Sequence, residues 1–271
     1  MFGFIGAGNM VSALVKGAHA NGFLTGENCL ITDKSGISGP ALAKSVAGRY
    51  LVSNLEVAKQ SDVLVLGVKP QHILAVLAEL RSVLETHQPL VISLAAGVKL
   101  EDIQMTAGSD VPVLRMMPNV NAAVQASMTA IVPGQNCTDE HIELALKFAR
   151  TFGEAMQIQE SELPIFTALA GCSPAWIFDL IDAFAMAGVK YGISKANASR
   201  IVTQAFLGSA TLVREATETG TKSTANLIDQ VCSPGGTTIA GLLAMQAAGS
   251  RHSAVEAVDA AVMQDMILGK K

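Results

Sequence analysis

The chain has 271 residues, of which 50% are hydrophobic and 15% charged, so it can bury a large core and is too apolar to be disordered. Its formal net charge is -4 and it contains no block of Lys and Arg, which argues against partners such as nucleic acid or an anionic membrane surface. The cysteines Cys29, Cys137, Cys172 and Cys232 form no CxxC pair, so neither a metal site nor a disulfide framework is expected, and reduced thiols fit a cytoplasmic protein.

Short apolar runs alternate with longer amphipathic stretches from the first residues to about residue 160. The runs have the length of strands buried on both faces, so the alternation predicts βαβ units and a Rossmann-like, doubly wound parallel sheet. A strand that begins at residue 2 also leaves no room for a signal peptide. In chain order, the predicted elements are strands at Phe2–Ile5, Cys29–Thr32, Val63–Leu66, Leu90–Ser93, Val113–Met116, Ser127–Val132 and Ala155–Gln159, and helices at Met10–Ala20, Ile73–Leu84, Leu100–Ala107 and Asp139–Thr151.

The pattern changes near residue 160, which predicts an N-terminal domain over 1–160 and an all-α domain over 161–271. Helices are expected at Glu162–Gly188, Lys195–Thr219 and Ser253–Leu268. The most apolar stretch, 163–188, contains Pro174, Asp179 and Asp182, so we interpret it as a core or interface helix and not as a membrane span. So much apolar helix surface predicts self-association.

A glycine-rich turn, Gly6-Ala7-Gly8-Asn9-Met10, joins the first strand to the first helix. Gly6 permits the tight turn, and Gly8 lets the backbone approach a pyrophosphate at the helix N-terminus, as in dinucleotide-binding proteins. Val11 stands where the fingerprint has a third small residue, so we expect looser packing of helix against strand there. The alternative is a glycine-rich turn that binds no ligand.

Asp33, Lys34 and Ser35 follow the second strand. A carboxylate at this point can bind the 2′-hydroxyl of NAD, whereas Lys34 and Ser35 can hold the 2′-phosphate of NADP. Both cofactors are therefore open, with a modest preference expected for NADPH, and Lys34 can equally be a solvated turn residue. Asn54 is a further candidate for cofactor binding.

Small residues also follow two later strands, where open α/β sheets bind their ligands. Gly67, Val68, Lys69 and Pro70 come after Val63–Leu66. Ala95, Ala96 and Gly97 come after Leu90–Ser93. These turns can let a nicotinamide ring lie against the backbone, and the alternative is plain strand-to-helix turns.

A second glycine-rich loop precedes a helix predicted at Ile239–Ala248, and its ligand-binding candidates are Ser233, Gly235, Gly236, Thr237 and Thr238. Its N–H groups and the helix N-terminus can form an anion site without a basic side chain, which suits a carboxylate. The Thr238 hydroxyl can then reach a neighbouring imine nitrogen. The residues alone favour simple helix capping slightly.

These motifs together resemble the pyrroline-5-carboxylate reductase family over nearly the whole chain. The shared segments are GFIGAGNM at 3–10, VKPQ at 68–71, SLAAGV at 93–98, RMMPN at 115–119 and SPGGTTIAGL at 233–242. The chain departs from the family at Val120 and Asn121, where Thr-Pro is usual, and at Cys172 within the segment AGCSPAW. These departures, together with Val11, leave two alternatives open: a non-catalytic paralogue that binds or regulates, and a reductase of another small cyclic imine.

The resemblance implies that the protein reduces Δ1-pyrroline-5-carboxylate to L-proline with NADPH or NADH, the last step of proline biosynthesis. It implies a homodimer or larger homo-oligomer joined through interlocking helical domains, with substrate between one subunit's cofactor and the partner's loop. The Gly235–Thr237 backbone would hold the substrate carboxylate, and Thr238 would be the catalytic residue that hydrogen-bonds the ring nitrogen. Lys190 and Lys195 flank a turn at Gly192 and lack the helical Lys and Asn pattern of the β-hydroxyacid dehydrogenases, the nearest rival enzymes.

Overall fold

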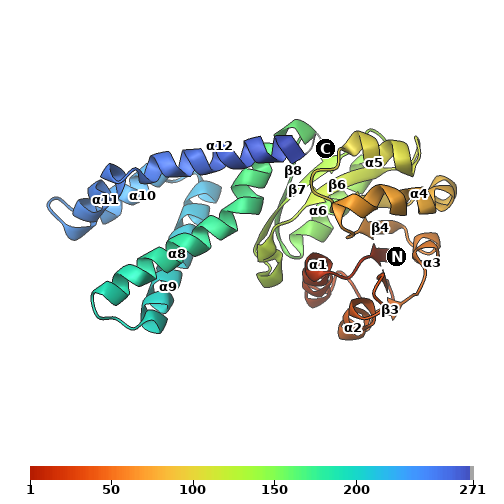
Figure 1. Ribbon diagram of the computed structural model, residues 1–271, viewed down its shortest axis with the longest axis horizontal. Coiled ribbons are helices and arrows are strands. Elements are labelled where there is room, and N and C mark those ends of the chain that lie inside the picture. Colours follow the sequence, from red (N-terminus) through yellow and green to blue (C-terminus); the bar gives the residue numbers. More distant parts are fainter. Residues whose placement is uncertain (269–271) are drawn as a thin grey trace. The chain divides into compact units, whose positions relative to one another are not determined.

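The computed structural model describes residues 1–268 and divides the chain into two compact units (Figure 1). Unit 1 comprises Met1–Gly171 together with the C-terminal segment from Ala261 onward, and unit 2 comprises Cys172–Ala260. The predicted division into functional domains at residue 160 stays a prediction.

Unit 1 is built on an eight-stranded sheet in the order β3-β2-β1-β4-β5-β6-β7-β8. All neighbouring strands are parallel except β6 and β7, which pair antiparallel. The chain leaves β1 toward β2 and β3 and then crosses back to β4, which makes the edge between β1 and β4 a topological switch point. The strands are β1 (Phe2–Ile5), β2 (Cys29–Thr32), β3 (Arg49–Tyr50), β4 (Val63–Leu66), β5 (Leu90–Ser93), β6 (Val113–Met117), β7 (Ser127–Pro133) and β8 (Gly153–Gln157).

The predicted doubly wound fold is confirmed, but β3 was missed and the last strand was misplaced at 155–159. β3 is a two-residue edge strand of Arg and Tyr, so no apolar run marks it. β8 begins at Gly153, two residues before the predicted start, and is mostly exposed. A Cβ at Gly153 would lie 2.1 Å from the Ser127 carbonyl oxygen, so the approach of the two strands requires glycine there.

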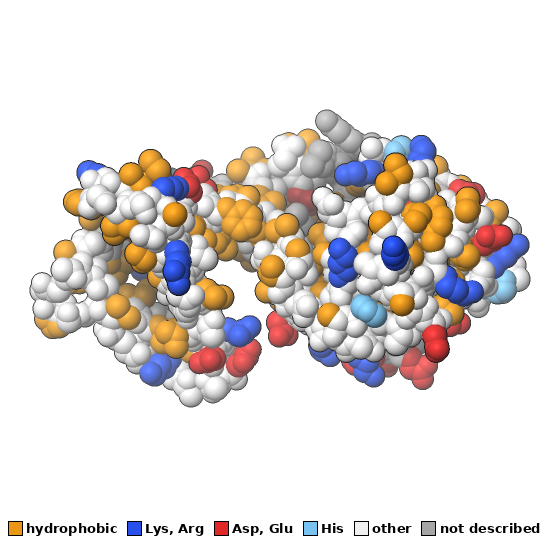
Figure 2. Space-filling view, turned by 90° about the horizontal axis from the view of Figure 1, so that it is seen from below, with side chains coloured by type: hydrophobic (Ala, Val, Ile, Leu, Met, Phe, Trp, Pro, Cys, Tyr) orange, Lys and Arg blue, Asp and Glu red, His pale blue; other side chains and the backbone are white. Residues whose placement is uncertain are grey.

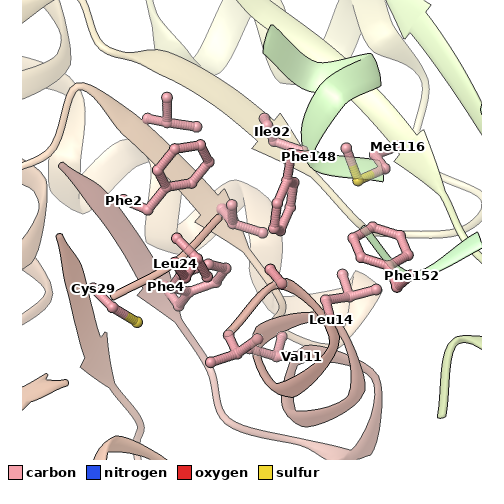
Figure 3. Close-up of a cluster of buried hydrophobic side chains, with 14 of the residues drawn as sticks. Phe2, Phe4, Val11, Leu14, Leu24, Cys29, Ile92, Met116, Phe148 and Phe152 are labelled. Atoms are coloured by element: carbon pink, nitrogen blue, oxygen red, sulfur yellow. The ribbon is translucent and has the colours of Figure 1, made fainter. Parts of the chain in front are cut away.

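Helices cover both faces of this sheet because side chains alternate along each strand. Val63 and Val65 of β4 pack into one core, and Leu64 and Leu66 pack into the other. The first core lies under α1 (Asn9–Ala20), α2 (Ser38–Ser45) and α6 (Asp139–Arg150), and includes the phenylalanine cluster of Figure 3. The second lies under α3 (Asn54–Lys59), α4 (Pro70–His87) and α5 (Leu100–Ala107).

The expected helix at 162–188 is divided in the structure. A turn of 3-10 helix (Glu160–Glu162) leads into α7 (Leu163–Phe166), a π-helical turn (Thr167–Cys172) and α8 (Ser173–Lys190). Pro174 has no N–H to donate to the Ala170 carbonyl, and this carbonyl instead accepts a 2.8 Å hydrogen bond from Asn119 Nδ2. The missing backbone donor gives a physical reason for the irregular turn.

The other helices are α9 (Lys195–Thr219), α10 (Thr224–Val231), α11 (Thr237–Ala247) and α12 (Ser250–Leu268), whose last residues belong to unit 1. α9 matches its predicted bounds, whereas α11 and α12 begin two and three residues before the predicted Ile239 and Ser253. Gly236 is the N-cap of α11, and Gly249, with φ +86°, separates α11 from α12.

Unit 2 exposes many large apolar side chains, and Figure 2 shows them spread over its surface. Phe178 of α8 and Leu207 of α9 are 58% and 60% exposed. The segment Glu160–Lys190 is long and apolar enough to cross a membrane, by length and composition alone. Exposed apolar surface of this extent is also typical of helices that pack against another subunit.

Val11 does not loosen the packing of α1, contrary to expectation. It is 1% exposed, and a Cβ added to Gly67 after β4 would lie 2.0 Å from Val11 Cγ2. The larger side chain on α1 is thus accommodated by the absence of a side chain at the end of β4.

Gly67→Ala is therefore expected to destabilise the fold by about 1–3 kcal/mol, because a β-branched side chain in a helix has little freedom to move aside. Adding Val11→Ala should remove the clash, so the double variant should be more stable than the sum of the single effects predicts. Urea unfolding of the four proteins measures this coupling. Additive losses would show that the two positions do not pack against each other.

Candidate cofactor cleft and substrate loop

A cavity of about 1060 Å³ lies where β1, β2 and β4 end. Open α/β sheets bind nucleotides at this edge, on either side of the switch point. The cavity brings together ten predicted cofactor residues: Gly6, Ala7, Gly8, Asp33, Lys34, Ser35, Asn54, Gly67, Val68 and Lys69.

The first glycine turn has the geometry that close approach of a phosphate requires. Gly6 has φ +102°, and a Cβ there would lie 2.6 Å from the Gly67 carbonyl oxygen, so only glycine fits. Gly8 is the N-cap of α1 and has no atom within 4 Å of an added Cβ, so its backbone faces open space. The first N–H groups of a helix have no partner within it, and Gly8, which directly precedes those of α1, lines the cleft.

Asp33 and Ser35 are bonded to each other at the end of β2. Ser35 Oγ donates to Asp33 Oδ2 and accepts a 3.2 Å hydrogen bond from the Ile37 N–H. Asp33 Oδ1 is buried beside Gly39, without a partner in the described part of the chain. The Ser35 hydroxyl therefore already donates its one hydrogen bond to Asp33. Lys34, which lies between these two residues in the sequence, is an exposed cation.

The opposite wall of the cleft comes from α3 and one face of α4, and sequence reasoning found only Asn54 there. Asn54 Nδ2 donates a 3.3 Å hydrogen bond to Glu79 Oε2. The other wall residues missed by the sequence include Val52, Ser53, His72, Ala75, Val76 and Glu79. His72 is exposed and lines the cleft. The α4 residues in this wall are His72, Ala75, Val76 and Glu79. They recur at helical spacing, and this spacing is the sequence signal that could have identified them.

The remaining predicted cofactor residues do not line this cleft. Asn9 is exposed at the start of α1, and Met10 packs against the first core. Pro70 is the first residue of α4, and Ala95 is buried in the second core. Ala96 is exposed in the turn after β5. Their predicted roles in cofactor binding stay predictions.

Gly97 lines a second cavity of about 440 Å³ within unit 1. Its wall includes the buried Arg115, whose Nη1 lies 2.7 Å from Glu160 Oε1, and Glu160 also accepts a hydrogen bond from the Leu100 N–H. Thr167 of the π-helical turn lines the same cavity, and its hydroxyl is buried without a partner among residues 1–268. These polar groups are far apart in sequence, so no local pattern marks them.

The second glycine loop forms a tight turn directly before α11. Gly235 has φ +65°, and the Gly236 N–H bonds the Ser233 carbonyl at 3.0 Å, which closes the turn before α11. Gly236 is the N-cap, so no side chain caps this helix and Thr238 is not its cap. Thr237 and Thr238 are exposed in the first helical turn, with their N–H groups at the positive end of the helix dipole.

Other reactive groups have structural surroundings. Burial raises the pKa of the Cys29 thiol to about 12 and also raises the pKa of Cys137, so neither is a thiolate at neutral pH. Lys195 is paired with Asp182 of α8. Within residues 1–268, no group of three His, Cys, Asp or Glu side chains is placed to hold a metal ion.

Two family models match the chain. One, described as pyrroline-5-carboxylate reductase dimerisation, matches residues 160–266. The other, described as NADP oxidoreductase, coenzyme F420-dependent, matches residues 1–97, which include the glycine turn and every residue that lines the cleft.

Similar proteins are known over the full length. Pyrroline-5-carboxylate reductase from Methanosarcina acetivorans is 38% identical over 269 residues, which cover 99% of this chain and 98% of that protein. The structure of a pyrroline-5-carboxylate reductase from Coxiella burnetii has a TM-score of 0.92 at 30% identity and covers 98% of this chain and 97% of its own. A Plasmodium falciparum pyrroline carboxylate reductase, crystallised with NADP bound, has a TM-score of 0.86 at 28% identity, with coverage of 99% and 97%.

Proposed function

Because this chain belongs to the pyrroline-5-carboxylate reductase family, we propose that it reduces Δ1-pyrroline-5-carboxylate to L-proline with NAD(P)H. The observation that carries the proposal is the cleft at the carboxyl ends of β1, β2 and β4, whose bare Gly6–Gly8 backbone fits a dinucleotide. The reaction also needs a site for the substrate carboxylate, and we assign this anion site to the SPGGTT segment at the start of α11.

The chemistry needs little acid–base help from the protein. The reduced nicotinamide supplies a hydride, which adds to the imine carbon, and the imine nitrogen carries the proton already as an iminium ion. We propose that the Gly235–Thr237 backbone, with Ser233 and Gly236 shaping the turn, holds the substrate carboxylate. Thr238 orients the ring nitrogen through its hydroxyl. The residues act by positioning and by electrostatics.

The cofactor is NADPH or NADH, and we propose a modest preference for NADPH. Lys34 is exposed at the cleft and can pair with a 2′-phosphate. Ser35 contributes less than its sequence position implies, because its hydroxyl donates its hydrogen bond to Asp33 Oδ2. The ratio of kcat/KM for the two cofactors measures the balance between Lys34 and Asp33.

The match to a dimerisation domain supports a homo-oligomer, and we propose assembly through the exposed apolar helices of unit 2. Burial of these side chains against a second subunit stabilises by about 25 cal/mol per Å² of apolar surface. Sedimentation at micromolar concentration is therefore expected to show a dimer or larger species. A homogeneous, soluble species at the 28.1 kDa chain mass would contradict this assembly.

We further propose that the protein acts in the cytoplasm, which suits its free cysteines, and that its substrate is a small molecule. We propose neither nucleic acid nor a membrane as a partner, because the net charge is -4. Two alternatives follow from Val120, Asn121 and Cys172: a non-catalytic relative, and a reductase of another cyclic imine. Oxidation of NAD(P)H on addition of pyrroline-5-carboxylate, compared with cyclic imines that lack the carboxylate or have a six-membered ring, separates the three. The proposal expects the highest kcat/KM with pyrroline-5-carboxylate.

A further inference from the structure

The cavity of about 440 Å³ in unit 1 shares no lining residue with the cofactor cleft. Its wall comes from the turn before α5, from β6, from the segment 160–167 and from the end of α12, all of which belong to unit 1. Its volume lies in the range of about 300–1,000 Å³ that is usual for small-molecule sites. Of the described residues that line it, only Gly97 belongs to a turn predicted to bind the cofactor. The proposed function therefore gives this cavity no ligand.

A buried arginine forms part of the wall. Arg115 is 8% exposed, and its Nη1 donates a 2.7 Å hydrogen bond to Glu160 Oε1. The same oxygen accepts a 2.7 Å hydrogen bond from the Leu100 N–H. A guanidinium has five N–H donors in a planar fork, so Glu160 orients the group and leaves donors for a second anion. A carboxylate is an anion that matches this fork.

The charged side chains of the cavity balance one another. Lys99 is exposed before α5, and Asp265 comes from α12. Neither has an ion-pair partner in the part of the chain that the structure describes. With Arg115 and Glu160, they bring two positive and two negative charges to one cavity. A ligand with a single charge would meet a like charge as well as an opposite one, whereas a ligand that carries both charges can place each beside its opposite.

Much of the remaining wall is apolar. Met117, Leu163 and Pro164 line the cavity, and Leu163 is buried in a small core against which Met117 packs. Gly97 has no atom within 4 Å of an added Cβ, so there is open space beside it. Apolar walls with a few charged groups suit a small ligand that has a short aliphatic side chain.

From these observations we propose that the cavity binds a free aliphatic α-amino acid in its zwitterionic form. Arg115 and Lys99 hold the carboxylate, and Glu160 and Asp265 hold the ammonium group. The apolar wall contacts the side chain. This site lies outside the cofactor cleft and the substrate loop, and it does not depend on the reaction proposed for them.

Calorimetric titration of the purified protein with L-valine tests the site. Isovalerate has the same carbon skeleton without the ammonium group, and isobutylamine has it without the carboxylate. L-Valine should bind saturably, at about one site per chain, with a Kd in the millimolar range or below. Each of the other two compounds should bind at least about tenfold more weakly, because it leaves charged groups of the cavity without a partner.

Two variants place the ligand in this cavity. Lys99→Glu should weaken L-valine binding at least about tenfold, and the fold should persist because Lys99 is the N-cap of α5, where a carboxylate suits the helix dipole. Asp265→Asn should weaken binding about fivefold, because the amide lacks the charge that pairs with the ammonium group. Lys16→Glu is the matched control, the same change at an exposed lysine of α1 that does not line the cavity, and it should bind as the wild type does.

The SPGGTT segment is the other site proposed for a carboxylate, so Thr238→Ala is titrated as well and should keep the wild-type affinity for L-valine. A loss in Thr238→Ala with none in Lys99→Glu would put the ligand in the substrate loop and overturn the proposal. Absence of saturable L-valine binding, equal binding of isovalerate, or wild-type affinity in both Lys99→Glu and Asp265→Asn would overturn it too.

Discussion

Gly8→Asp should abolish NAD(P)H binding in a protein that remains folded. The added Cβ meets no atom within 4 Å, and φ is -73°, so an aspartate fits the backbone without strain. Aspartate is also a favourable N-cap, so α1 should not lose stability. Its carboxylate would face the cofactor phosphates, and like charges about 4 Å apart repel by ~4 kcal/mol at an effective dielectric constant of ~20. Fluorescence titration should show affinity reduced at least ~100-fold.

The controls separate charge from bulk and from position. Gly8→Ala adds the Cβ without the charge and should lose much less affinity. Ala20→Asp places a carboxylate at the opposite, exposed end of α1 and should bind cofactor as the wild type does. Melting temperatures confirm that each variant is folded. Retained affinity in a folded Gly8→Asp protein would show that the pyrophosphate does not lie on this turn.

Thr238→Ala should lower kcat/KM for pyrroline-5-carboxylate by roughly ten- to a hundredfold, the loss of one well-placed hydrogen bond of ~1.5–3 kcal/mol. Thr238→Ser keeps the hydroxyl and should recover much of the rate. NAD(P)H affinity should hardly change, because the proposed phosphate site is the Gly6–Gly8 turn.

The structure sharpens this test, because a capping role for Thr238 would have predicted a loss of ~1 kcal/mol in stability. Gly236, not Thr238, is the N-cap of α11, so the melting temperature should stay near that of the wild type. Thr224→Ala is the matched control, an exposed threonine in the first turn of α10. Near-wild-type turnover in Thr238→Ala would remove Thr238 from the reaction.

The sequence predicted the fold wherever burial leaves a local pattern. β1, β2, β4 and β5 match their predicted bounds, because strands buried on both faces are continuous apolar runs. β3 and β8 lack such runs, since β3 lies at the sheet edge and β8 is mostly exposed. The π-helical turn depends on the bond between Asn119 and the Ala170 carbonyl, a tertiary contact that no local pattern contains.

The residues of the candidate site likewise fall into those that a local sequence pattern marks and those that it does not. Glycine turns at the ends of strands can be recognised in the sequence, because their backbone conformation requires glycine. Ten of the cofactor residues predicted in this way meet in one cleft. Glu79, Arg115 and Thr167 are defined by partners or cavities that only folding assembles. The error at Val11 has the same origin, because the fingerprint describes one position whereas the packing depends on Gly67 as well.

Transfer of deuterium from cofactor to product tests the central claim most directly. Pyrroline-5-carboxylate is incubated with the enzyme and NADPH that carries deuterium at C4 in the transferred position, and the proline formed is analysed by mass spectrometry and NMR. Hydride addition to the imine carbon predicts proline with a single deuterium at C5. Absence of proline, or proline without the label, would contradict the account.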